Sequence, residues 1–574
     1  MVEATTLIEA LELNAARRPE RGIHLIDGRG RAGEGRRYPD LLTSFQAAAA
    51  RLATHGVRRR EPMLVALPTS REFIEYWVGG LFHGALPVAM APVGSAGALA
   101  VHLQKLDDVR TRIGAGTVVC SESLRDEARA AGLEELAGAC VTAAELDALT
   151  PRPDWKAHRA EPDEIAFLQL TSGSTGRQRA VQISHRSALH NARGIDETIG
   201  HPLGGPASEV LQSIVSWLPL NHDMGLIGCL FLSLIHGFDL WLMQPKSFLA
   251  RPLWWLKHLG EHGPTLAEAP NFAFQLCVER VDPEAARDLD LSNWRAAMTG
   301  AEMVRPETID AFCERFGPVG FRPETFRPCY GLAEATLAVT VDGVARGART
   351  LSAPAGTDHG FGLTDIVSVG QPLPDTEVGI FAADGTRVRD GSIGEISVKG
   401  PSIFSGYYND PEASAECLVD GWLRTGDLGF LDSGELYITG RTKDLIIVNG
   451  NNLMPHELER IAENASEGGG SRRSAAFSIA DGADGERVVL AVEVSETDAD
   501  RLATIEREVR LGVGHTVSVP LADVVFVRRG RLSKTTSGKV QRNRVRQQYL
   551  DGKLERLTVS VPAPTAVEDR DTPQ

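Results

Sequence analysis

The chain has 574 residues, which is too long for one ordinary hydrophobic core, so at least two domains are predicted. Its 43% hydrophobic and 24% charged residues are typical of a soluble globular protein. With 60 basic and 76 acidic side chains, the formal net charge is -16. This charge argues against a nucleic acid or an anionic membrane as the partner.

The N-terminal segment "MVEATTLIEALELNAARRPE" carries an acid early and no uninterrupted apolar stretch, so it does not resemble a secretory signal. No segment reaches the roughly 18 consecutive apolar residues of a membrane span, and membrane insertion is not expected. The seven cysteines are scattered and form no C-x-x-C pair. This pattern argues against a disulfide framework or a zinc site and indicates a cytoplasmic protein with reduced thiols.

The first part of the chain alternates between amphipathic and buried segments. Helices and strands are predicted in turn at 3–18, 23–26, 38–57, 61–68, 70–85 and 86–92. This alternation continues through most of the first four hundred residues and predicts parallel sheets covered by helices. A proline-rich, charged link at 150–164 leads into a buried strand at 165–170, and the apolar run at 226–235 is expected to be a buried helix.

The pattern changes after about residue 370. Short strands separated by glycine turns, at 376–382, 394–400 and 434–440, indicate a barrel-like subdomain over about 370–440. A helix at 455–465 and a small α+β region at 475–550 follow. We therefore expect an α/β fold with a large N-terminal domain over 1–443. A small mobile α+β domain over 444–555 and a disordered tail over 556–574 complete the expected organisation.

The segment after the strand ending at Leu170 is a run of hydroxyls and glycines, "TSGSTG" at 171–176. Glycines let the backbone approach an anion, and N–H groups and hydroxyls can then point at it. The segment lacks the G-x-x-x-x-G-K-[ST] pattern of a Walker loop. By itself such a run is more often an ordinary turn, so the remaining motifs decide its role.

Six further motifs follow this loop in chain order. They are "SWLPLNHDMGL" (216–226), "TGAEMVRPET" (299–308), "CYGLAEAT" (329–336), "GWLRTGDLGFL" (421–431), "GRTKDLIIVNGNNLMPHELE" (440–459) and "LSKTTSGKVQR" (532–542). In this order they resemble the adenylate-forming superfamily of acyl-CoA synthetases, peptide-synthetase adenylation domains and luciferases. The resemblance covers nearly everything from about residue 5 to residue 550. It implies that ATP and a carboxylic acid react to give an acyl-adenylate and pyrophosphate.

Within that superfamily, "HDMG" at 222–225 and "YGLAEAT" at 330–336 are most similar to fatty acyl-AMP ligases. The extra length at about 341–366 lies where those enzymes carry an insertion linked to weak use of coenzyme A. The resemblance implies a medium- or long-chain fatty acid as substrate. It also implies transfer to the phosphopantetheine thiol of an acyl carrier protein in trans, in lipid, polyketide or lipopeptide biosynthesis. The alternatives are an acyl-CoA synthetase, with coenzyme A as acceptor, and a stand-alone amino-acid adenylating enzyme. A catalytically silent binding protein is a further alternative.

The resemblance assigns a set of residues to the nucleotide. The expected ATP-binding residues are Thr171, Ser172, Gly173, Ser174, Thr175, Gly176, Ala301, Glu302, Tyr330, Gly331, Asp427 and Arg441. Among them, Tyr330 is expected to stack on adenine, and Asp427 is expected to accept hydrogen bonds from both ribose hydroxyls, as an ionised carboxylate can.

Three residues are expected to be catalytic. Lys539 would bridge the reacting carboxylate and the α-phosphate, where negative charge builds in the transition state. Glu334 is expected to hold Mg²⁺ together with Thr171, because Mg²⁺ takes one or two carboxylates plus substrate phosphates. His222 is expected to gate the acyl pocket and steer the carboxylate.

Two further groups follow from the resemblance. Lys443 and Asp444 match the hinge about which the small domain turns. The expected acyl pocket contains Trp217, Asp223, Met224, Gly225, Asn271 and Phe272. Asp223 stands near the position where amino-acid-activating relatives pair the substrate ammonium, which keeps the amino-acid alternative open. The chain also departs from the family, since Gln178, Arg179 and Ala180 replace the usual Pro-Lys-Gly after the phosphate loop.

Overall fold

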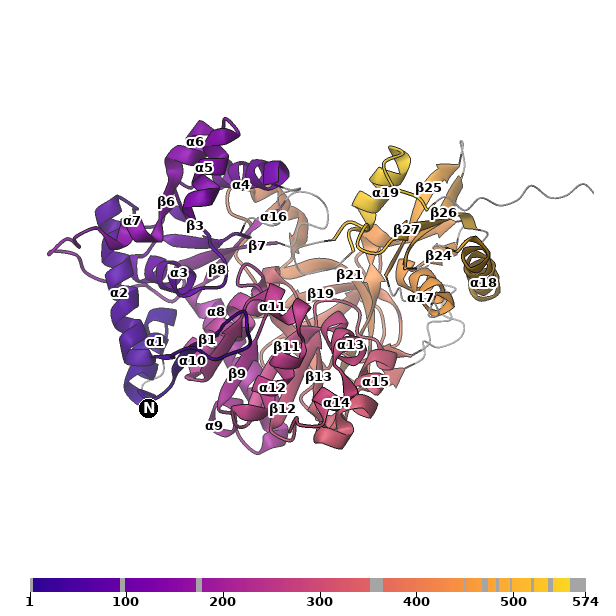
Figure 1. The fold of residues 1–574 in the computed structure, drawn as a ribbon, viewed down its shortest axis with the longest axis horizontal. Helices are drawn as coiled ribbons and strands as arrows, with labels where there is room; N and C mark the ends of the chain where they lie inside the picture. The colour runs from indigo at the N-terminus through magenta and orange to yellow at the C-terminus, as the bar shows by residue number, and fades with distance from the viewer. Residues whose placement is uncertain are drawn as a thin grey trace, which may run out of the picture. The chain divides into compact units, whose positions relative to one another are not determined.

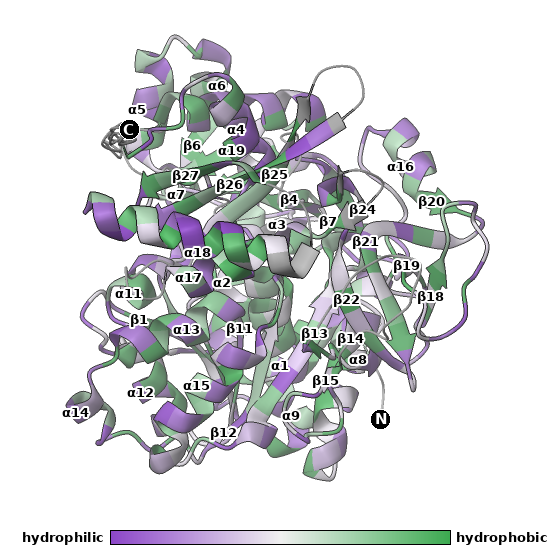
Figure 2. Cartoon of the chain, turned by 90° about the vertical axis from the view of Figure 1, so that its right-hand side faces the viewer, coloured by the Kyte–Doolittle hydropathy of each residue, from purple (hydrophilic) through white to green (hydrophobic). Residues whose placement is uncertain are grey.

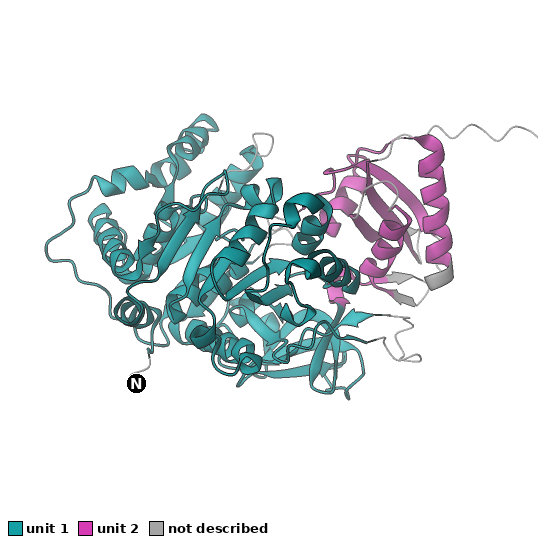
Figure 3. Ribbon diagram, turned by 60° about the horizontal axis from the view of Figure 1, so that its bottom comes forward, with its two compact units in different colours: residues 1–352, 364–439 teal, residues 353–363, 440–574 magenta. Residues whose placement is uncertain are grey.

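The computed structural model describes residues 4–92, 99–171, 178–351, 365–448, 451–466, 473–481, 485–495, 498–517, 521–534 and 540–557. Contacts divide the described chain into two compact units, shown in different colours in Figure 3. Unit 1 contains 4–351 and 365–439, and unit 2 contains the described residues from Gly440 onward. Within the described ranges, no helix is both long and apolar enough to cross a bilayer.

The first sheet of unit 1 has six strands. In spatial order they are β6 (Cys140–Thr142), β5 (Thr117–Cys120), β3 (Pro62–Ala66), β4 (Leu86–Ala89), β7 (Ile165–Leu170) and β8 (Ala180–Ser184). Neighbouring strands run parallel except β8, which pairs antiparallel with β7. The segment between β7 and β8 therefore connects adjacent strands at the carboxyl end of β7, where the sequence predicts the phosphate loop.

The second sheet has nine strands. Their order is β17 (Gln371–Pro372), β14 (Ala338–Val341), β13 (Phe326–Gly331), β12 (Trp294–Gly300), β11 (Thr265–Pro270), β9 (Ser213–Ser216), β10 (Asp239–Met243), β1 (Gly22–Ile26) and β2 (Arg36–Arg37). The strands from β13 to β1 are parallel, and those at both edges are antiparallel. The predicted parallel α/β architecture is confirmed, with antiparallel edges that the alternation of elements did not predict.

Helices cover the sheets of unit 1 (Figure 1). They include α1 (Leu7–Arg17), α2 (Tyr38–His55), α3 (Arg71–His83), α4 (Leu99–Ile113), α5 (Glu122–Ala130), α8 (His185–Gly200), α10 (Leu232–His236), α11 (Pro245–Ala250), α12 (Leu253–Glu261), α13 (Asn271–Arg280) and α15 (Pro306–Phe316). The apolar run predicted as a buried helix is buried and helical. Its first part, η3 (Met224–Phe231), is a π-helix, a form that often marks a functional site.

The barrel-like subdomain is a third, antiparallel sheet of five strands. It contains β18 (Glu377–Phe381), β19 (Gly394–Lys399), β20 (Leu418–Val419), β21 (Trp422–Asp432) and β22 (Glu435–Arg441). The strands expected from the glycine-separated segments are confirmed at β18, β19 and β22.

Unit 2 is built on a three-stranded sheet of β25 (Ser474–Asp481), β26 (Gly485–Val494) and β27 (Leu521–Arg528). Its helices are α17 (Pro455–Ala465), α18 (Ala499–Val517) and α19 (Arg542–Leu550). In Figure 2, β26 and β27 are coloured mostly as hydrophobic, whereas α5 of unit 1 carries many hydrophilic residues. The contact boundary at Gly440 lies a few residues before the hinge expected at Lys443 and Asp444, which stays a prediction.

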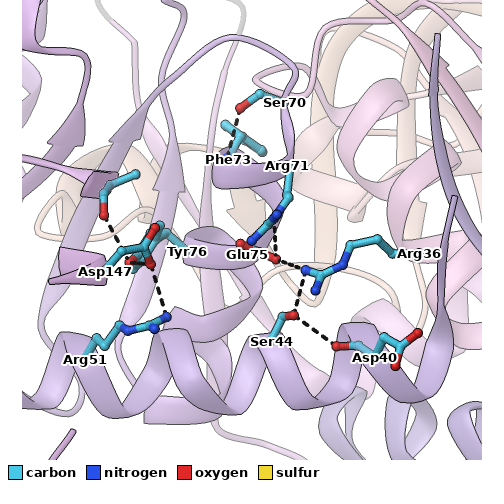
Figure 4. A network of polar contacts seen from close by, with 11 residues as sticks. Arg36, Asp40, Ser44, Arg51, Ser70, Arg71, Phe73, Glu75, Tyr76 and Asp147 are labelled. Atoms are coloured by element: carbon cyan, nitrogen blue, oxygen red, sulfur yellow. Dashed lines mark hydrogen bonds and ion pairs between the residues drawn. The ribbon is translucent and has the colours of Figure 1, made fainter. Parts of the chain in front are cut away.

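A polar network fastens α3 to its neighbours (Figure 4). Glu75 on α3 is 7% exposed and accepts hydrogen bonds from Arg36 and, at 2.9 Å, from Arg71. Arg36 also donates to Ser44 of α2 at 2.7 Å. Glu75 thus sits between two partly exposed cations.

We expect Glu75→Ala to lower the free energy of unfolding by about 1–2 kcal/mol. Removing one partner of a well-buried pair costs more, but both arginines retain access to water. Urea unfolding monitored by circular dichroism measures the change. Glu72→Ala, at an exposed position in the same helical turn, is the matched control and should change stability by less than about 0.5 kcal/mol. Equal effects of the two substitutions would contradict a structural role for the network.

Candidate functional site

Three groups of predicted site residues lie at the carboxyl ends of adjacent parallel strands. Asn271 and Phe272 follow β11, Ala301 and Glu302 follow β12, and Tyr330 is the penultimate residue of β13. In a parallel sheet these ends lie on one edge, the usual place for a ligand in an open α/β fold. The nine-stranded sheet therefore brings predicted acyl-pocket residues and predicted nucleotide residues together at one edge.

The loop after β12 has an unusual backbone. Ala301 has φ +64°, in the left-handed region that side chains other than glycine rarely adopt. The Glu302 carboxylate accepts the Phe272 N–H at 2.6 Å, and the Asn271 side chain accepts the Arg305 N–H at 3.0 Å. The loops after β11 and β12 are thus fixed to each other, which is the type of restraint that holds a strained residue in place.

Tyr330 and Asp427 lie far apart in the sequence and meet in the structure. The Tyr330 hydroxyl donates to Asp427 Oδ2 at 2.6 Å, at the short end of the range for O–H···O hydrogen bonds. Asp427 lies within β21 and is 4% exposed, while Tyr330 is half-buried at the end of β13. The antiparallel subdomain thereby places its carboxylate against the edge of the nine-stranded sheet.

Glu334 is held by a tyrosine that the sequence did not single out. It lies in the 3₁₀ turn η6 (Ala333–Ala335), and its Oε1 accepts a hydrogen bond from the Tyr407 hydroxyl at 2.7 Å. Burial, followed by the negative charge of Glu334, raises the pKa of Tyr407 well above its usual value, so the phenol stays a donor. The Glu334 carbonyl also accepts the Phe404 N–H at 2.9 Å. These contacts orient the carboxylate.

The two ends of the predicted phosphate loop are tied together. Thr171 N–H donates to the Arg179 carbonyl at 2.9 Å, and the Arg179 N–H donates to Thr171 Oγ1 at 3.1 Å. The Gln178 side chain adds a bond to the Thr171 carbonyl at 3.0 Å. The other predicted loop residues, Ser172, Gly173, Ser174, Thr175 and Gly176, lie outside the described residues.

Arg179, one of the departures from the family pattern, connects this loop to Glu334. Its guanidinium lies 5.1 Å from the centre of the Tyr407 ring and 3.8 Å from Asp410. The same tyrosine donates to Glu334. Arg179, Tyr407 and Glu334 therefore form a continuous row from the loop toward the candidate metal ligand.

Two oxygen groups of this region suit the chemistry of Mg²⁺. The carboxylate of Glu334 and the hydroxyl of Thr171 are hard oxygen donors, and both belong to the row joined through Arg179 and Tyr407. One carboxylate together with substrate phosphates is an ordinary Mg²⁺ environment. The donor chemistry of these two side chains therefore fits the ion.

The predicted acyl-pocket residues fall into two groups, an aromatic group around Trp217 and a group at the start of η3. Trp217 is 4% exposed, stacks on Phe248 with ring centres 4.1 Å apart, and meets Phe272 edge-on at 5.9 Å. Asp223 caps η3 by accepting the Met224 N–H at 2.8 Å, and its Oδ1 lies 2.7 Å from Nδ1 of His222. Gly225 faces the chain so closely that a Cβ would lie 2.4 Å from the Pro219 carbonyl oxygen.

Glu268 on β11 is a buried acid that the sequence did not single out. It is 1% exposed, and its Oε1 has no hydrogen-bond partner among the described residues. Burial, followed by the charge of Asp223, raises the pKa of Glu268 to about 8. A Cβ on Gly228 of η3 would lie 2.1 Å from Glu268 Oε2, so the missing side chain there makes room for the carboxyl group.

We expect Glu268→Gln to remove a pH-dependent loss of stability. Because the folded-state pKa is about 8, above the ordinary value of 4.5, the unfolded state releases this proton first as the pH rises. Wild-type stability should therefore fall relative to Glu268→Gln across pH 4.5 to 8. Between about pH 6 and 7.5 the relative loss should be about 2 kcal/mol. Parallel stability curves for the two proteins over this range, measured by urea unfolding, would contradict the assignment.

The remaining predicted residues belong to unit 2. Arg441 ends β22, and Lys443 and Asp444 lie in the 3₁₀ turn η7 (Thr442–Asp444). Asp444 accepts a hydrogen bond from Arg542 at 2.8 Å, and Arg542 also pairs with the buried Glu459 at 2.6 Å. Lys539 lies outside the described residues, three positions before Arg542.

Comparison with known proteins shows the class to which this arrangement belongs. Residues 11–408 match the AMP-binding enzyme family, so the chain belongs to that family. It is an AMP-forming ligase and uses ATP.

Individual relatives refine this class. The chain is 31% identical over 551 residues to the medium-chain fatty acid–acyl-carrier-protein ligase JamA of Moorena producens, covering 91% of each chain. It is 32% identical over 566 residues to a Caulobacter vibrioides protein named provisionally as an acyl-CoA synthetase, covering 95% of this chain and 96% of that protein. A solved structure from a study of fatty acyl-adenylate ligases of E. coli and L. pneumophila superimposes with a TM-score of 0.86 and 30% identity, over 95% of this chain and 98% of that one. The activity is therefore that of an adenylate-forming fatty acid ligase.

Proposed function

We propose that this enzyme activates a medium- or long-chain fatty acid as acyl-AMP and transfers the acyl group to the phosphopantetheine thiol of a carrier protein in trans. The observation that carries the adenylation step is the bond between Tyr330 and the buried Asp427. It presents an aromatic ring and a carboxyl group on one edge of the sheet. A nucleoside needs such a pair, the ring for the base and the carboxylate for the two ribose hydroxyls.

The phosphates are assigned to the segment between β7 and β8, with Thr171 at its start. Mg²⁺, when bound, neutralises part of the triphosphate charge, and Glu334 and Thr171 would hold it. Tyr407 keeps the Glu334 carboxylate oriented, and Arg179 adds positive charge beside the loop. Lys539 of unit 2 is assigned to the charge that builds between the carboxylate and the α-phosphate. These roles follow the family motifs.

The substrate assignment rests on the composition of the region around η3. Trp217, Phe248 and Phe272 form an aromatic cluster, and all eight residues of η3 are buried. Asp223, the one acid of the "HDMG" segment, already caps η3 and contacts His222. This engagement favours a fatty acid over an amino acid, whose ammonium group would need an acid facing the substrate.

The carrier-protein assignment rests on the segment at 341–366, of which the structure describes both ends. Thr350–Leu351 and Ile366–Val367 pair as the antiparallel strands β15 and β16. Arg349 forms an ion pair with Glu435 at the start of β22, and Ser368 donates to the same carboxylate at 2.8 Å. The base of the segment is thus fastened to the antiparallel subdomain. We infer that this anchored segment restricts the use of coenzyme A, and the acyl-CoA synthetase alternative assigns it no such role.

The acceptor assignment can be tested without disturbing the anchored base. A variant in which 352–364 is replaced by a short Gly–Ser linker should raise the yield of acyl-CoA and leave pyrophosphate exchange nearly unchanged. An equal-length Gly–Ser replacement is the matched control that separates length from sequence. Rapid acyl-CoA formation by the unmodified enzyme would instead identify an acyl-CoA synthetase.

A further inference from the structure

Two histidines and a glutamate lie together at the amino edge of the nine-stranded sheet, between the end of α12 and the start of β11. His258 and Glu261 are on α12, and His262 is its C-terminal cap. One ligand atom from each of the three lies within 4.8 Å of the others. The predicted nucleotide residues follow the opposite ends of the strands. Since β11 has six residues, roughly 20 Å of strand separates the two edges.

The hydrogen bonds fix which ring nitrogen of His258 faces the cluster. His258 is 4% exposed, and its Nε2 lies 3.1 Å from the Gly30 carbonyl, which only an N–H can satisfy. The proton is therefore on Nε2, and Nδ1 carries a lone pair. A bond from the second ring nitrogen to a backbone carbonyl is the arrangement usual for histidines that bind metal.

The ring of His262 is held with its Nε2 facing the Nδ1 lone pair of His258. His262 Nε2 lies 2.9 Å from His258 Nδ1, and Glu261 Oε2 lies 3.8 Å from the same Nδ1. The His262 ring stacks on Trp241 at 3.5 Å, and His24 stacks on Trp241 at 3.9 Å. Without a metal, the 2.9 Å contact is a single N–H···N bond. A tetrahedral ion needs its two nitrogen ligands about 3.3 Å apart. Moving the two rings apart by a few tenths of an ångström therefore makes room for the ion.

We propose that His258, His262 and Glu261 form a binding site for a divalent transition metal, with Zn²⁺ as the ion that two imidazoles and a carboxylate suit best. On binding, the proton shared between the rings moves from Nε2 of His262 to its Nδ1, and both facing nitrogens become ligands. Water completes the coordination on the side of Glu261, whose side chain is 46% exposed. The scattered cysteines argued against zinc, but that argument does not apply to histidines at i and i+4.

The site ties the end of α12 to the Gly30 turn and to β10 through Trp241. It is remote from the strand ends that carry the nucleotide motifs, so its occupancy should stabilise unit 1 without supporting adenylation. This separates it from the proposed Mg²⁺ ligands Glu334 and Thr171. Its test is therefore independent of the proposed function.

The experiment is a Zn²⁺ titration of the full chain, free of any purification tag and stripped with a chelator, followed by calorimetry and thermal unfolding. The wild type should bind one equivalent at these residues and unfold at a higher temperature. His262→Ala should weaken this binding at least roughly 100-fold, and Glu261→Gln, at an exposed position that should not affect folding, roughly 10-fold. His55→Ala removes an exposed histidine at the end of α2 and is the matched control, with binding unchanged.

Substitution of Co²⁺ gives a second readout, since visible absorption bands should appear in the wild type and vanish in His262→Ala. Equal Zn²⁺ binding by the wild type and His262→Ala, or no saturable binding by the wild type, would overturn the proposal. The histidine pair would then be only a hydrogen bond.

Discussion

Lys539→Ala is expected to slow formation of acyl-AMP by on the order of 100-fold or more, equivalent to about 2.7 kcal/mol of barrier. A positive charge between the attacking carboxylate and the α-phosphate stabilises the transition state more than the bound substrates, so its loss lowers the rate of the chemical step. Fatty-acid-dependent pyrophosphate exchange measures this step directly.

The control is another lysine of the same unit. Lys553 is exposed and pairs with Asp551 at 3.0 Å, so Lys553→Ala removes the same charge from unit 2 without affecting the proposed chemistry. Its exchange rate should match the wild type. If Lys539→Ala exchanges pyrophosphate at a near-normal rate, Lys539 is not the catalytic cation.

Arg542→Ala is expected to destabilise unit 2 locally by about 3–5 kcal/mol. Arg542 bonds to Glu459, which is 4% exposed, and to Asp444 in the turn after β22. Truncating it leaves Glu459 as a buried charge without its cation, which costs far more than the loss of an exposed pair. Because the chain has two units, local amide exchange is a better measure than one global unfolding curve.

Hydrogen exchange of the α17 amides should accelerate by roughly 100-fold or more in Arg542→Ala. Arg544 is exposed on α19, the helix that begins with Arg542, and it is the matched control. Arg544→Ala should leave the exchange of the α17 amides unchanged. Unaltered protection in Arg542→Ala would mean that the pair contributes little to the stability of unit 2.

The sequence predicted the features that depend on local pattern. The alternation of strands and helices predicted the parallel sheets. The short strands separated by glycines predicted the antiparallel subdomain with β18, β19 and β22. The motif order predicted the family, which the match over 11–408 confirms. The individual site assignments stay predictions, although the bond between Tyr330 and Asp427 brings two of them together.

Features that depend on distant contacts could not be predicted in the same way. Tyr407 meets Glu334 across the fold, and nothing in the "FSGYYND" segment distinguishes it from an ordinary core aromatic. The π form of η3 was also hidden, because a run in which every residue is apolar has no periodicity that would separate a π-helix from an α-helix. Glu268 looked like one acid in an apolar strand, and only its burial against η3 sets it apart.

Fatty acid activation and transfer to a carrier protein are tested most directly by pyrophosphate exchange over a panel of fatty acids and amino acids, followed by offering the product coenzyme A or a carrier protein. We predict exchange with decanoate and longer acids, with kcat/KM rising about fourfold per added methylene until the pocket is full. Acyl-AMP should accumulate in the presence of coenzyme A and be consumed by the carrier-protein thiol. Exchange with α- or β-amino acids but not with decanoate and longer acids would contradict fatty acid activation.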